Sequence, residues 1–153
     1  MVALQTQLKS IAYGSDAYRQ AARIRYRLFY QAHDISFESI FDAPEDRDLH
    51  LAIVERSSNC VLAYGRLRQH SFNEFQIYQM VVLPEFQGQG LGARILQGLT
   101  AAAIDRGAAL LRLDARVEKV PFYQKFGFES FGNVFPSSMT GVPHIRMQKK
   151  IAQ

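Results

Sequence analysis

The fold of this chain is decided by one stretch that joins an apolar run to a helical pattern, Val82-Leu83-Pro84-Glu85-Phe86-Gln87-Gly88-Gln89-Gly90-Leu91-Gly92-Ala93. The apolar run predicts a strand, and the residues that recur at helical spacing from Leu91 onward predict a helix. Glycines between a strand and a helix let backbone N–H groups converge on a ligand, and the helix N-terminus adds unpaired donors with a partial positive charge. The segment from Gln87 to Gly92 is therefore predicted to bind an anion such as phosphate.

Glycine spacing by itself leaves other interpretations open. Gly88, Gly90 and Ala93 also satisfy the G-x-G-x-x-A pattern of dinucleotide-binding folds, and Asp114 ends the next predicted strand. Two features argue against a nicotinamide enzyme. Residues 84–86 separate the glycines from their strand, and the preceding strands are predicted to be antiparallel. The chain is also short for a dinucleotide domain plus a substrate domain. A purely structural glycine turn is the remaining alternative.

The rest of the chain predicts further elements on both sides of this stretch. In chain order they are a helix over 16–30, strands over 49–55, 61–68 and 75–83, a helix from Leu91 that ends at Gly107, a strand over 109–115, a short helix over 119–126, and strands over 128–134 and 144–151. Short turns between the first three strands indicate an antiparallel meander. We therefore expect an α/β domain with a mixed, mostly antiparallel central sheet, one βαβ crossover and flanking helices.

Length and composition place the chain among globular proteins. Its 153 residues suit a single domain, 1–153, and its 48% hydrophobic and 21% charged residues are close to the averages for such domains. The net charge of +4 fits an anionic ligand. Because the basic residues form no dense run, we expect no nucleic-acid partner.

The number of cysteines and the hydropathy of the chain indicate its cellular compartment and whether it binds a metal. Cys60 is the sole cysteine, so the chain can form no intrachain disulfide and no Cys-based zinc site, and we expect no metal. Met1–Ser10 lacks the apolar core of a signal peptide, and no apolar run is long enough to span a membrane. We expect a cytoplasmic protein without a membrane partner, and we leave a homodimer open.

Two motifs in register resemble the GNAT superfamily of N-acetyltransferases. Gln87-x-x-Gly90-x-Gly92 is similar to the Q/R-x-x-G-x-G/A pyrophosphate loop of that family, and residues 81–86 are similar to the strand and Pro-Glu-aromatic approach that precede it. Residues 121–128, Pro-Phe-Tyr-Gln-Lys-Phe-Gly-Phe, resemble the family's F/L-Y-x-K-x-G-F segment. One predicted helix and one predicted strand separate the two motifs, as they do in the family.

This resemblance implies a GNAT-like fold and an acetyl-CoA-dependent N-acyltransferase. The acetyl group would move from acetyl-CoA, the cosubstrate, to a primary amine of a small-molecule or peptide acceptor by direct transfer, without an acyl-cysteine. A catalytically silent acyl-CoA-binding sensor or interaction module of the same fold is the alternative. Residues 141–147, Gly-Val-Pro-His-Ile-Arg-Met, further resemble the G-I-P-H-x-x-M motif of a small bacterial subfamily.

The resemblance also implies which residues form the site. Tyr123 is expected to be the general acid that protonates the leaving thiolate, its alternative being an aromatic ring packed after Phe122. An N–H near Val81 or Val82 is expected to polarise the thioester carbonyl. The pantetheine arm would pair with the backbone of Met80, Val81 and Val82. The pyrophosphate would lie on the loop residues Gln87, Gly88, Gln89, Gly90, Leu91, Gly92 and Ala93, with the Gln87 amide ordering the loop. Arg94 and Lys125 would either attract the anion from outside the loop or be solvated charges on a helix face.

Two positions depart from the family's pattern. Arg116 stands seven residues before Tyr123, where many relatives carry an Asn that contacts the pantetheine arm. Tyr78 stands nine residues before Gln87, where many relatives carry the Glu that activates the amine. No base can be carried over, and the candidates that stay open are Asp114, Glu74, His144 and an ordered water chain.

An acidic stretch over 34–48 suggests the charge of the acceptor. It holds six carboxylates against Arg47 alone, a net charge of −5, and in the resembled fold it borders the acceptor side of the cleft. An acidic rim there would attract a cationic amine. The alternative is a solvated acidic loop that balances a basic body.

Overall fold

The computed structural model describes residues 4–152, so the first three residues of the Met1–Ser10 segment and Gln153 lie outside it. These residues form a seven-stranded sheet in the order β1-β2-β3-β4-β5-β7-β6. The strands are β1 (Thr6–Ile11), β2 (Leu49–Glu55), β3 (Val61–Gln69), β4 (Glu74–Val82), β5 (Leu110–Arg116), β6 (Glu129–Pro136) and β7 (Pro143–Lys150). Neighbouring strands are antiparallel, except that β4 and β5 are parallel. The predicted meander and βαβ crossover are confirmed, and this sheet order is not that of a doubly wound dinucleotide fold.

Helical segments connect and cover the strands. The α-helices are α1 (Asp16–Arg25), α2 (Leu91–Asp105) and α3 (Val120–Gln124); the 3-10 segments are η2 (Gln31–His33), η3 (Phe37–Ile40), η4 (Ala43–Arg47), η5 (Pro84–Phe86) and η6 (Val117–Lys119). Ser15 caps α1, since its hydroxyl accepts a 3.2 Å hydrogen bond from the Tyr18 N–H. Gly107 follows α2 with a φ of +91°, as predicted for a C′ glycine.

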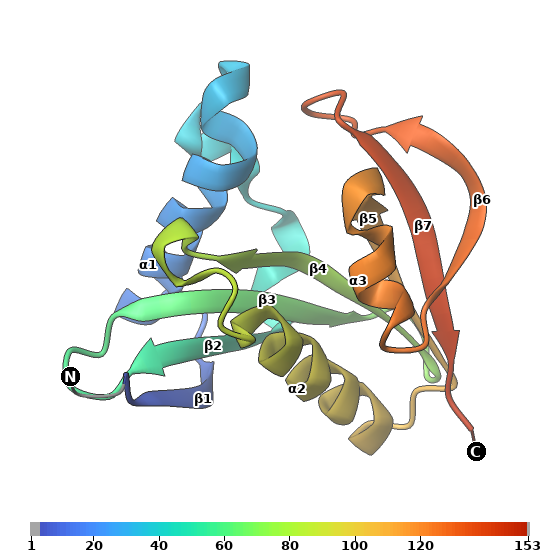
Figure 1. Ribbon diagram of the computed structural model, residues 1–153, viewed down its shortest axis with the longest axis horizontal. Coiled ribbons are helices and arrows are strands. Elements are labelled where there is room, and N and C mark those ends of the chain that lie inside the picture. Colours follow the sequence, from blue (N-terminus) through green and yellow to red (C-terminus); the bar gives the residue numbers. More distant parts are fainter. Residues whose placement is uncertain (1–3, 153) are drawn as a thin grey trace.

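The helices pack on opposite faces of the sheet (Figure 1). The apolar stripe of α2, which includes Leu91, Ile95 and Leu99, packs with Phe128 and Met147 in the larger core cluster. Tyr123 of α3 packs against the same cluster. On the other face, Ala21 and Ile24 of α1 pack on Val54, Tyr64 and Val81. The helices α1 and α2 therefore cover opposite faces of β2, β3 and β4.

Two features of the N-terminal part differ from prediction. The sequence predicts no strand before residue 16, but β1 pairs with β2 along its full length. Its pattern is weak because its polar residues lie on an edge strand, with Leu8 alone packed against the larger core cluster. The predicted helix over 16–30 is α-helical to Arg25 and then becomes a π-helical turn, η1 (Tyr26–Tyr30).

The parallel strands β4 and β5 pair over only part of their length. Their register runs from Glu74 opposite Leu110 to Ile77 opposite Leu113 and then ends. Beyond that point β4 continues on β3 up to Val82, whereas β5 continues on β7 up to Arg116. Figure 1 shows the consequence, since β2–β4 run across the view and β5–β7 rise along its right side. The sheet is thus split at its centre, and β4 has an unpaired edge on the split.

Gly65 marks the closest approach of α2 to the sheet. A Cβ atom at Gly65 would lie 2.8 Å from Ile95 Cγ2 and 2.9 Å from Leu99 Cδ1, both in the buried core. We expect Gly65→Ala to lower the free energy of unfolding by about 1–3 kcal/mol, measured by urea denaturation, because the helix must shift to admit the methyl group. Gly92→Ala is the control, since its nearest neighbours would be 3.7 Å away. Equal stability of the two variants would contradict the close approach.

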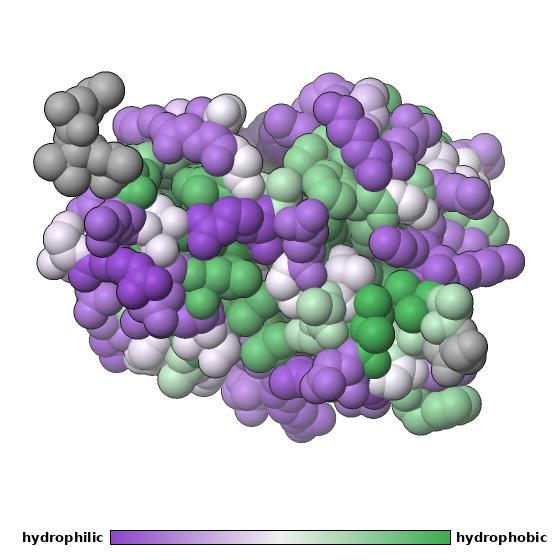
Figure 2. Space-filling view, turned by 60° about the horizontal axis from the view of Figure 1, so that its bottom comes forward, coloured by the Kyte–Doolittle hydropathy of each residue, from purple (hydrophilic) through white to green (hydrophobic). Residues whose placement is uncertain are grey.

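The surface is mixed in character. Figure 2 shows hydrophobic and hydrophilic side chains interspersed on the face that carries α2. Exposed apolar side chains of the described residues include Phe72, Phe131 and Val134. Between residues 4 and 152, no helix is both long and apolar enough to cross a membrane.

Candidate active site

A cleft of about 870 Å³ occupies the split between β4 and β5. Its walls come from β4, the glycine loop, the start of α2, α3, the π-helical turn and the connection from β6 to β7. The predicted site residues that line it are Met80, Val81, Val82, Gln87, Gly88, Gly90, Leu91, Gly92, Ala93 and Tyr123. Gln89 is exposed and does not line the cleft. The fold therefore brings together two sequence motifs, residues 87–92 and residues 121–128, that are separated by 28 residues.

The glycine loop presents backbone donors at one end of the cleft. Gly88 and Gly90 both have a φ of +81°, a conformation that favours glycine, and a Cβ atom added to either would meet nothing within 4 Å. Gly90 is the N-cap of α2 and has no side chain to cap the first turn. Among the described residues, no partner is found for the N–H groups of Leu91, Gly92 and Ala93. With the positive end of the α2 dipole, these amides form an open cradle for an anion.

Gln87 ties this cradle to the end of β4. Its Nε2 donates a 3.2 Å hydrogen bond to the Val82 carbonyl oxygen, a contact consistent with the predicted ordering of the loop. The Leu83 N–H donates to the Leu62 carbonyl of β3 at 2.9 Å. Because backbone groups alternate along a strand, the N–H of Val81 also faces β3 and that of Val82 faces the cleft. Val81 and Val82 are the two residues whose N–H was expected to polarise the thioester carbonyl. Of these two, Val82 has its N–H on the open edge of β4.

Sequence reasoning missed a residue in the middle of β4. Gln79 has a φ of +53° inside the strand, at a bulge where Gln79 and Met80 of β4 lie opposite Gly65 alone of β3. Its Oε1 accepts a 3.2 Å hydrogen bond from Arg66, and its Nε2 donates to the Tyr30 hydroxyl. These contacts fix a conformation that glutamine adopts rarely. No pattern in the sequence signals it, because the partners come from β3 and the π-helical turn.

Tyr123 projects from α3 into the cleft. Its ring packs edge-to-face against Phe122 and Phe128, with centroids 5.1 Å and 6.2 Å away. No hydrogen-bond partner of its hydroxyl is found among residues 4–152. Burial raises the pKa of Tyr123 to about 12, so the phenol carries its proton throughout the neutral range. The hydroxyl is thus a protonated, uncommitted donor.

Polar residues line the cleft on the face opposite α2. Tyr78 of β4, Asp114 and Arg116 of β5 and His144 of β7 alternate with core residues and therefore share this face. Asp114 is ion-paired with Arg146, whose Nε lies 2.9 Å from Asp114 Oδ1. The Arg116 guanidinium lies 5.2 Å from the centre of the Phe29 ring, so it bridges from β5 to the π-helical turn.

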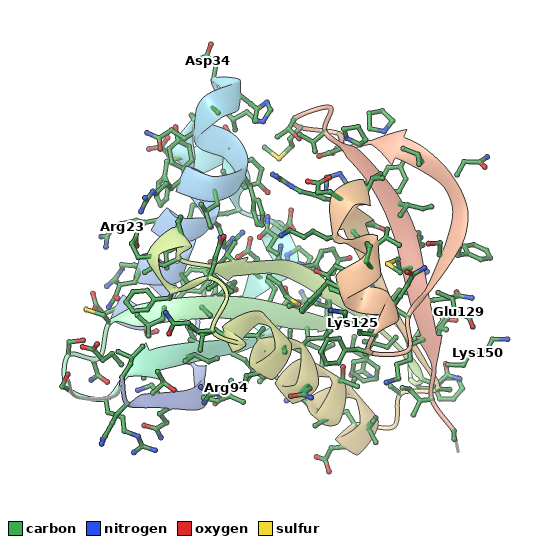
Figure 3. All side chains as sticks on the ribbon, in the orientation of Figure 1. Arg23, Asp34, Arg94, Lys125, Glu129 and Lys150 are labelled. Carbon is green, nitrogen blue, oxygen red and sulfur yellow. The ribbon has the colours of Figure 1, made fainter. Side chains whose placement is uncertain are left out.

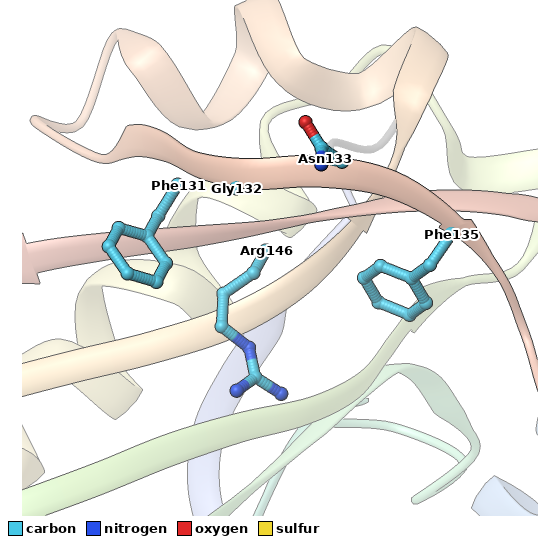
Figure 4. A pocket seen from close by; sticks show the side chains of 5 residues that line it. All are labelled: Phe131, Gly132, Asn133, Phe135 and Arg146. Carbon is cyan, nitrogen blue, oxygen red and sulfur yellow. The ribbon is translucent and has the colours of Figure 1, made fainter.

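A second, smaller pocket of about 350 Å³ adjoins this face (Figure 4). Figure 4 shows the Arg146 guanidinium between the rings of Phe131 and Phe135. Phe135 also lines the main cleft, so a molecule seated on the polar face can extend over β6 and β7.

The acidic stretch is not a rim of the cleft, because no residue between 34 and 48 lines it. Glu45 is fully buried and ion-paired with Arg25 at 2.8 Å. Asp48 and Asp42 pair with the buried Arg66 at 2.7 Å and 2.8 Å. Glu45 and Asp48 are therefore buried counter-ions of arginines inside the protein, whereas Asp42 reaches the buried Arg66 from an exposed position.

Asp34 of the acidic stretch and the two cations expected outside the loop, Arg94 and Lys125, do not line the cleft. Asp34 follows η2 and points outward from the tip of that segment (Figure 3). Arg23 points outward from α1 in the same view. Arg94 donates a 2.7 Å hydrogen bond to Thr6 of β1, so it holds α2 to the edge strand. Lys125 is exposed. Within residues 4–152, no group of three His, Cys, Asp or Glu side chains is placed to hold a metal ion.

Comparison with known proteins agrees with this geometry. The sequence profile described as an acetyltransferase (GNAT) domain matches residues 19–151. An uncharacterized N-acetyltransferase of Bacillus subtilis, YjcF, is 26% identical over 91% of this chain and 96% of its own. The structure of Escherichia coli ElaA superposes with a TM-score of 0.79 at 18% identity, covering 95% of this chain and all of that one. An aminoglycoside 6'-N-acetyltransferase complexed with coenzyme A superposes with a TM-score of 0.76 at 16% identity, over 96% of this chain and 98% of its own.

Proposed function

Because this chain belongs to the GNAT acetyltransferase family, we propose that it moves the acetyl group of acetyl-CoA directly to a primary amine of a small molecule or peptide. The observation that carries the proposal is the unpaired edge of β4, which leads straight into the free amides at the start of α2. An extended pantetheine arm can add to that edge as a strand would. The pyrophosphate then reaches the cradle formed by Gly88 to Ala93, where the donors are uncommitted.

In this arrangement the amine approaches from the polar face and the thioester from the α2 side. The amine nitrogen attacks the thioester carbon, so that a C–N bond forms and the carbonyl oxygen gains negative charge. The N–H of Val82 stabilises that charge. The C–S bond then breaks, and the sulfur leaves with the electron pair.

Tyr123 assists the departure of the sulfur. A phenol with a pKa of about 12 is a weaker acid than a thiol at ~8.5, so it does not give up its proton before the C–S bond breaks. Instead its O–H donates a hydrogen bond to the sulfur as negative charge develops there. The proton reaches the sulfur during or after cleavage, and solvent restores the phenol.

The test is turnover of acetyl-CoA against a panel of amines, with release of the free thiol as the signal. The panel contains Nα-acetyl-lysine, a peptide with a free N-terminus, a polyamine and an aminoglycoside. Thiol release that requires an amine supports the proposal. Tight binding of acetyl-CoA without amine-dependent release would favour the sensor or interaction module instead.

The site of the pyrophosphate is tested by Gly90→Glu. The carboxylate would lie in the cradle and repel the phosphates, so we expect acetyl-CoA to bind about 100-fold more weakly in calorimetry. Gly90→Ala is the matched control, because it carries the same cost of a non-glycine residue at a φ of +81° without the charge. Equal affinities of the two variants would place the pyrophosphate elsewhere.

A further inference from the structure

The proposed reaction needs a group that takes a proton from the amine, and the family's usual position is occupied by Tyr78. Burial raises the pKa of Tyr78, against the opposing charges of Arg68 and Arg66. Burial likewise raises the pKa of Tyr30 in the same cleft. Both phenols therefore keep their protons at neutral pH, and neither can accept one.

The carboxylates near the cleft are engaged elsewhere. Asp114 accepts from two nitrogens of Arg146, at 2.9 Å and 3.4 Å, so its charge is already neutralised. Glu74 does not line the cleft, and it faces Arg112 at 3.8 Å. Among the described residues that line the cleft, this leaves the imidazole of His144 as the group with an uncommitted lone pair.

The tautomer of His144 follows from its one hydrogen bond. Its Nδ1 lies 2.7 Å from the Val142 carbonyl oxygen, which can only accept, so Nδ1 must carry the proton. In the neutral ring the lone pair then resides on Nε2. No partner of Nε2 is found among residues 4–152. The turn that begins β7 thus holds the imidazole with its basic nitrogen free.

The position of His144 suits an incoming amine. It pairs with Arg116 of β5 and Phe135 of β6, and it shares the polar face of the cleft with Tyr78 and Asp114. The charged and titratable groups that line the cleft with it are Arg116 and Asp114 from β5, Tyr78 from β4, Tyr30 from the π-helical turn, Lys119 from η6 and Tyr123 from α3, and Arg146 lies on its own strand.

We propose that His144 Nε2 is the general base that takes a proton from the acceptor ammonium, a role that rests on the proposed acetyl transfer. The nitrogen of R–NH₃⁺ loses two protons on its way to the amide. One passes to His144 Nε2, which frees the lone pair for attack on the thioester carbon, and His144 returns it to solvent. The other leaves the nitrogen after the C–N bond has formed, and one proton is gained by the departing sulfur. The sum is ammonium plus acetyl-CoA giving amide, free thiol and one proton.

The variant His144→Asn separates this role from a structural one. The asparagine amide reproduces the Nδ1 donor to Val142 but offers no base in place of Nε2. At pH 7 we expect kcat/KM for the fastest panel amine to fall by about 10²–10⁴-fold, while calorimetric affinity for acetyl-CoA stays unchanged. The deficit should shrink as pH rises, since more of the amine then arrives already deprotonated. His33→Asn, at an exposed histidine of η2, is the control and should behave as the parent protein.

Three results would overturn the proposal. The first is a His144→Asn variant with near-parental activity at pH 7, and the second is a deficit that does not change with pH. The third comes from nitrogen-15 NMR of the neutral ring without any substrate, if the proton is on Nε2 instead of Nδ1. If acetyl-CoA binds but no panel amine is turned over by the parent protein, the proposed function fails and this role falls with it. Turnover by the parent with an unaffected variant rejects the role of His144 alone.

Discussion

Replacing Glu45 with alanine should lower the free energy of unfolding by about 3–5 kcal/mol, because it leaves buried arginines without their counter-charge. Glu45 is fully buried and accepts from Arg25 at 2.8 Å and 3.1 Å and from the Tyr18 hydroxyl at 2.6 Å. Arg66, also fully buried, lies 3.8 Å from the same carboxylate. Domains are commonly stable by only ~5–15 kcal/mol, so a loss of this size is a large share of the total.

The adjacent residue supplies the control for this measurement. Asp46 lies in the same segment, η4, but is exposed. Asp46→Asn should change the free energy of unfolding by less than about 0.5 kcal/mol in the same urea titration. If Glu45→Ala does not fold, Glu45→Gln keeps the shape and removes the charge, and thermal unfolding should still show a clear loss. A Glu45→Gln variant as stable as Asp46→Asn would contradict the importance of the network.

The same carboxylate predicts how stability depends on pH. Burial alone would raise the pKa of Glu45, but the hydrogen bond and charge of Arg25, the charge of Arg66 and the Tyr18 hydroxyl outweigh it and lower the pKa to about 2. A carboxyl whose pKa is depressed on folding contributes stability above its unfolded pKa, near 4.5, and loses it as pH falls toward 2. Acid unfolding should therefore become progressively easier between these values.

The ion network also explains why sequence reasoning misjudged the acidic stretch. Charge counting over 34–48 finds a net charge of −5, and nothing local shows that the partners Arg25, Arg66 and Arg68 come from α1 and β3. His50 belongs to the same cluster, with its ring nitrogens 2.6 Å from the Tyr64 hydroxyl and 2.7 Å from the Glu45 carbonyl oxygen. From the sequence alone, buried charged residues are mistaken for surface residues when their ion-pair partners lie far away in the chain.

Elements with a strong local signal were predicted well. The strand at 49–55 and the start of the helix at Leu91 agree with the structure, because apolar periodicity and the glycine boundary both lie within the segment. The π-helical turn and β1 were not predicted, since each depends on tertiary partners. The same division holds in the cleft. The glycine loop and Tyr123 can be recognised from motifs, whereas the Gln79 bulge exists only once β3 and β4 have paired.

Tyr123→Phe should lower kcat by about 10²–10⁴-fold while changing the KM for acetyl-CoA by only a few-fold. Phenylalanine keeps the ring that packs on Phe122 and Phe128, so the cleft retains its shape. What it removes is the hydroxyl that we propose donates to the departing sulfur. Tyr13→Phe, at an exposed tyrosine, is the control and should leave both constants unchanged. A loss confined to the KM for acetyl-CoA would mean that Tyr123 only packs against the cosubstrate.

The pH profile gives this role a second test. A proton donor works while it is protonated, so its contribution is present below its pKa and lost above it. With the pKa of Tyr123 raised by burial to about 12, its ionisation cannot reduce kcat at pH 7–10. We expect kcat of the parent protein to show no alkaline fall in that range, and the ratio of parent to Tyr123→Phe rates to stay constant across it. A ratio that collapses near pH 10 would show a phenol with an ordinary pKa, and therefore a cleft wetter around Tyr123 than the packing of α3 implies.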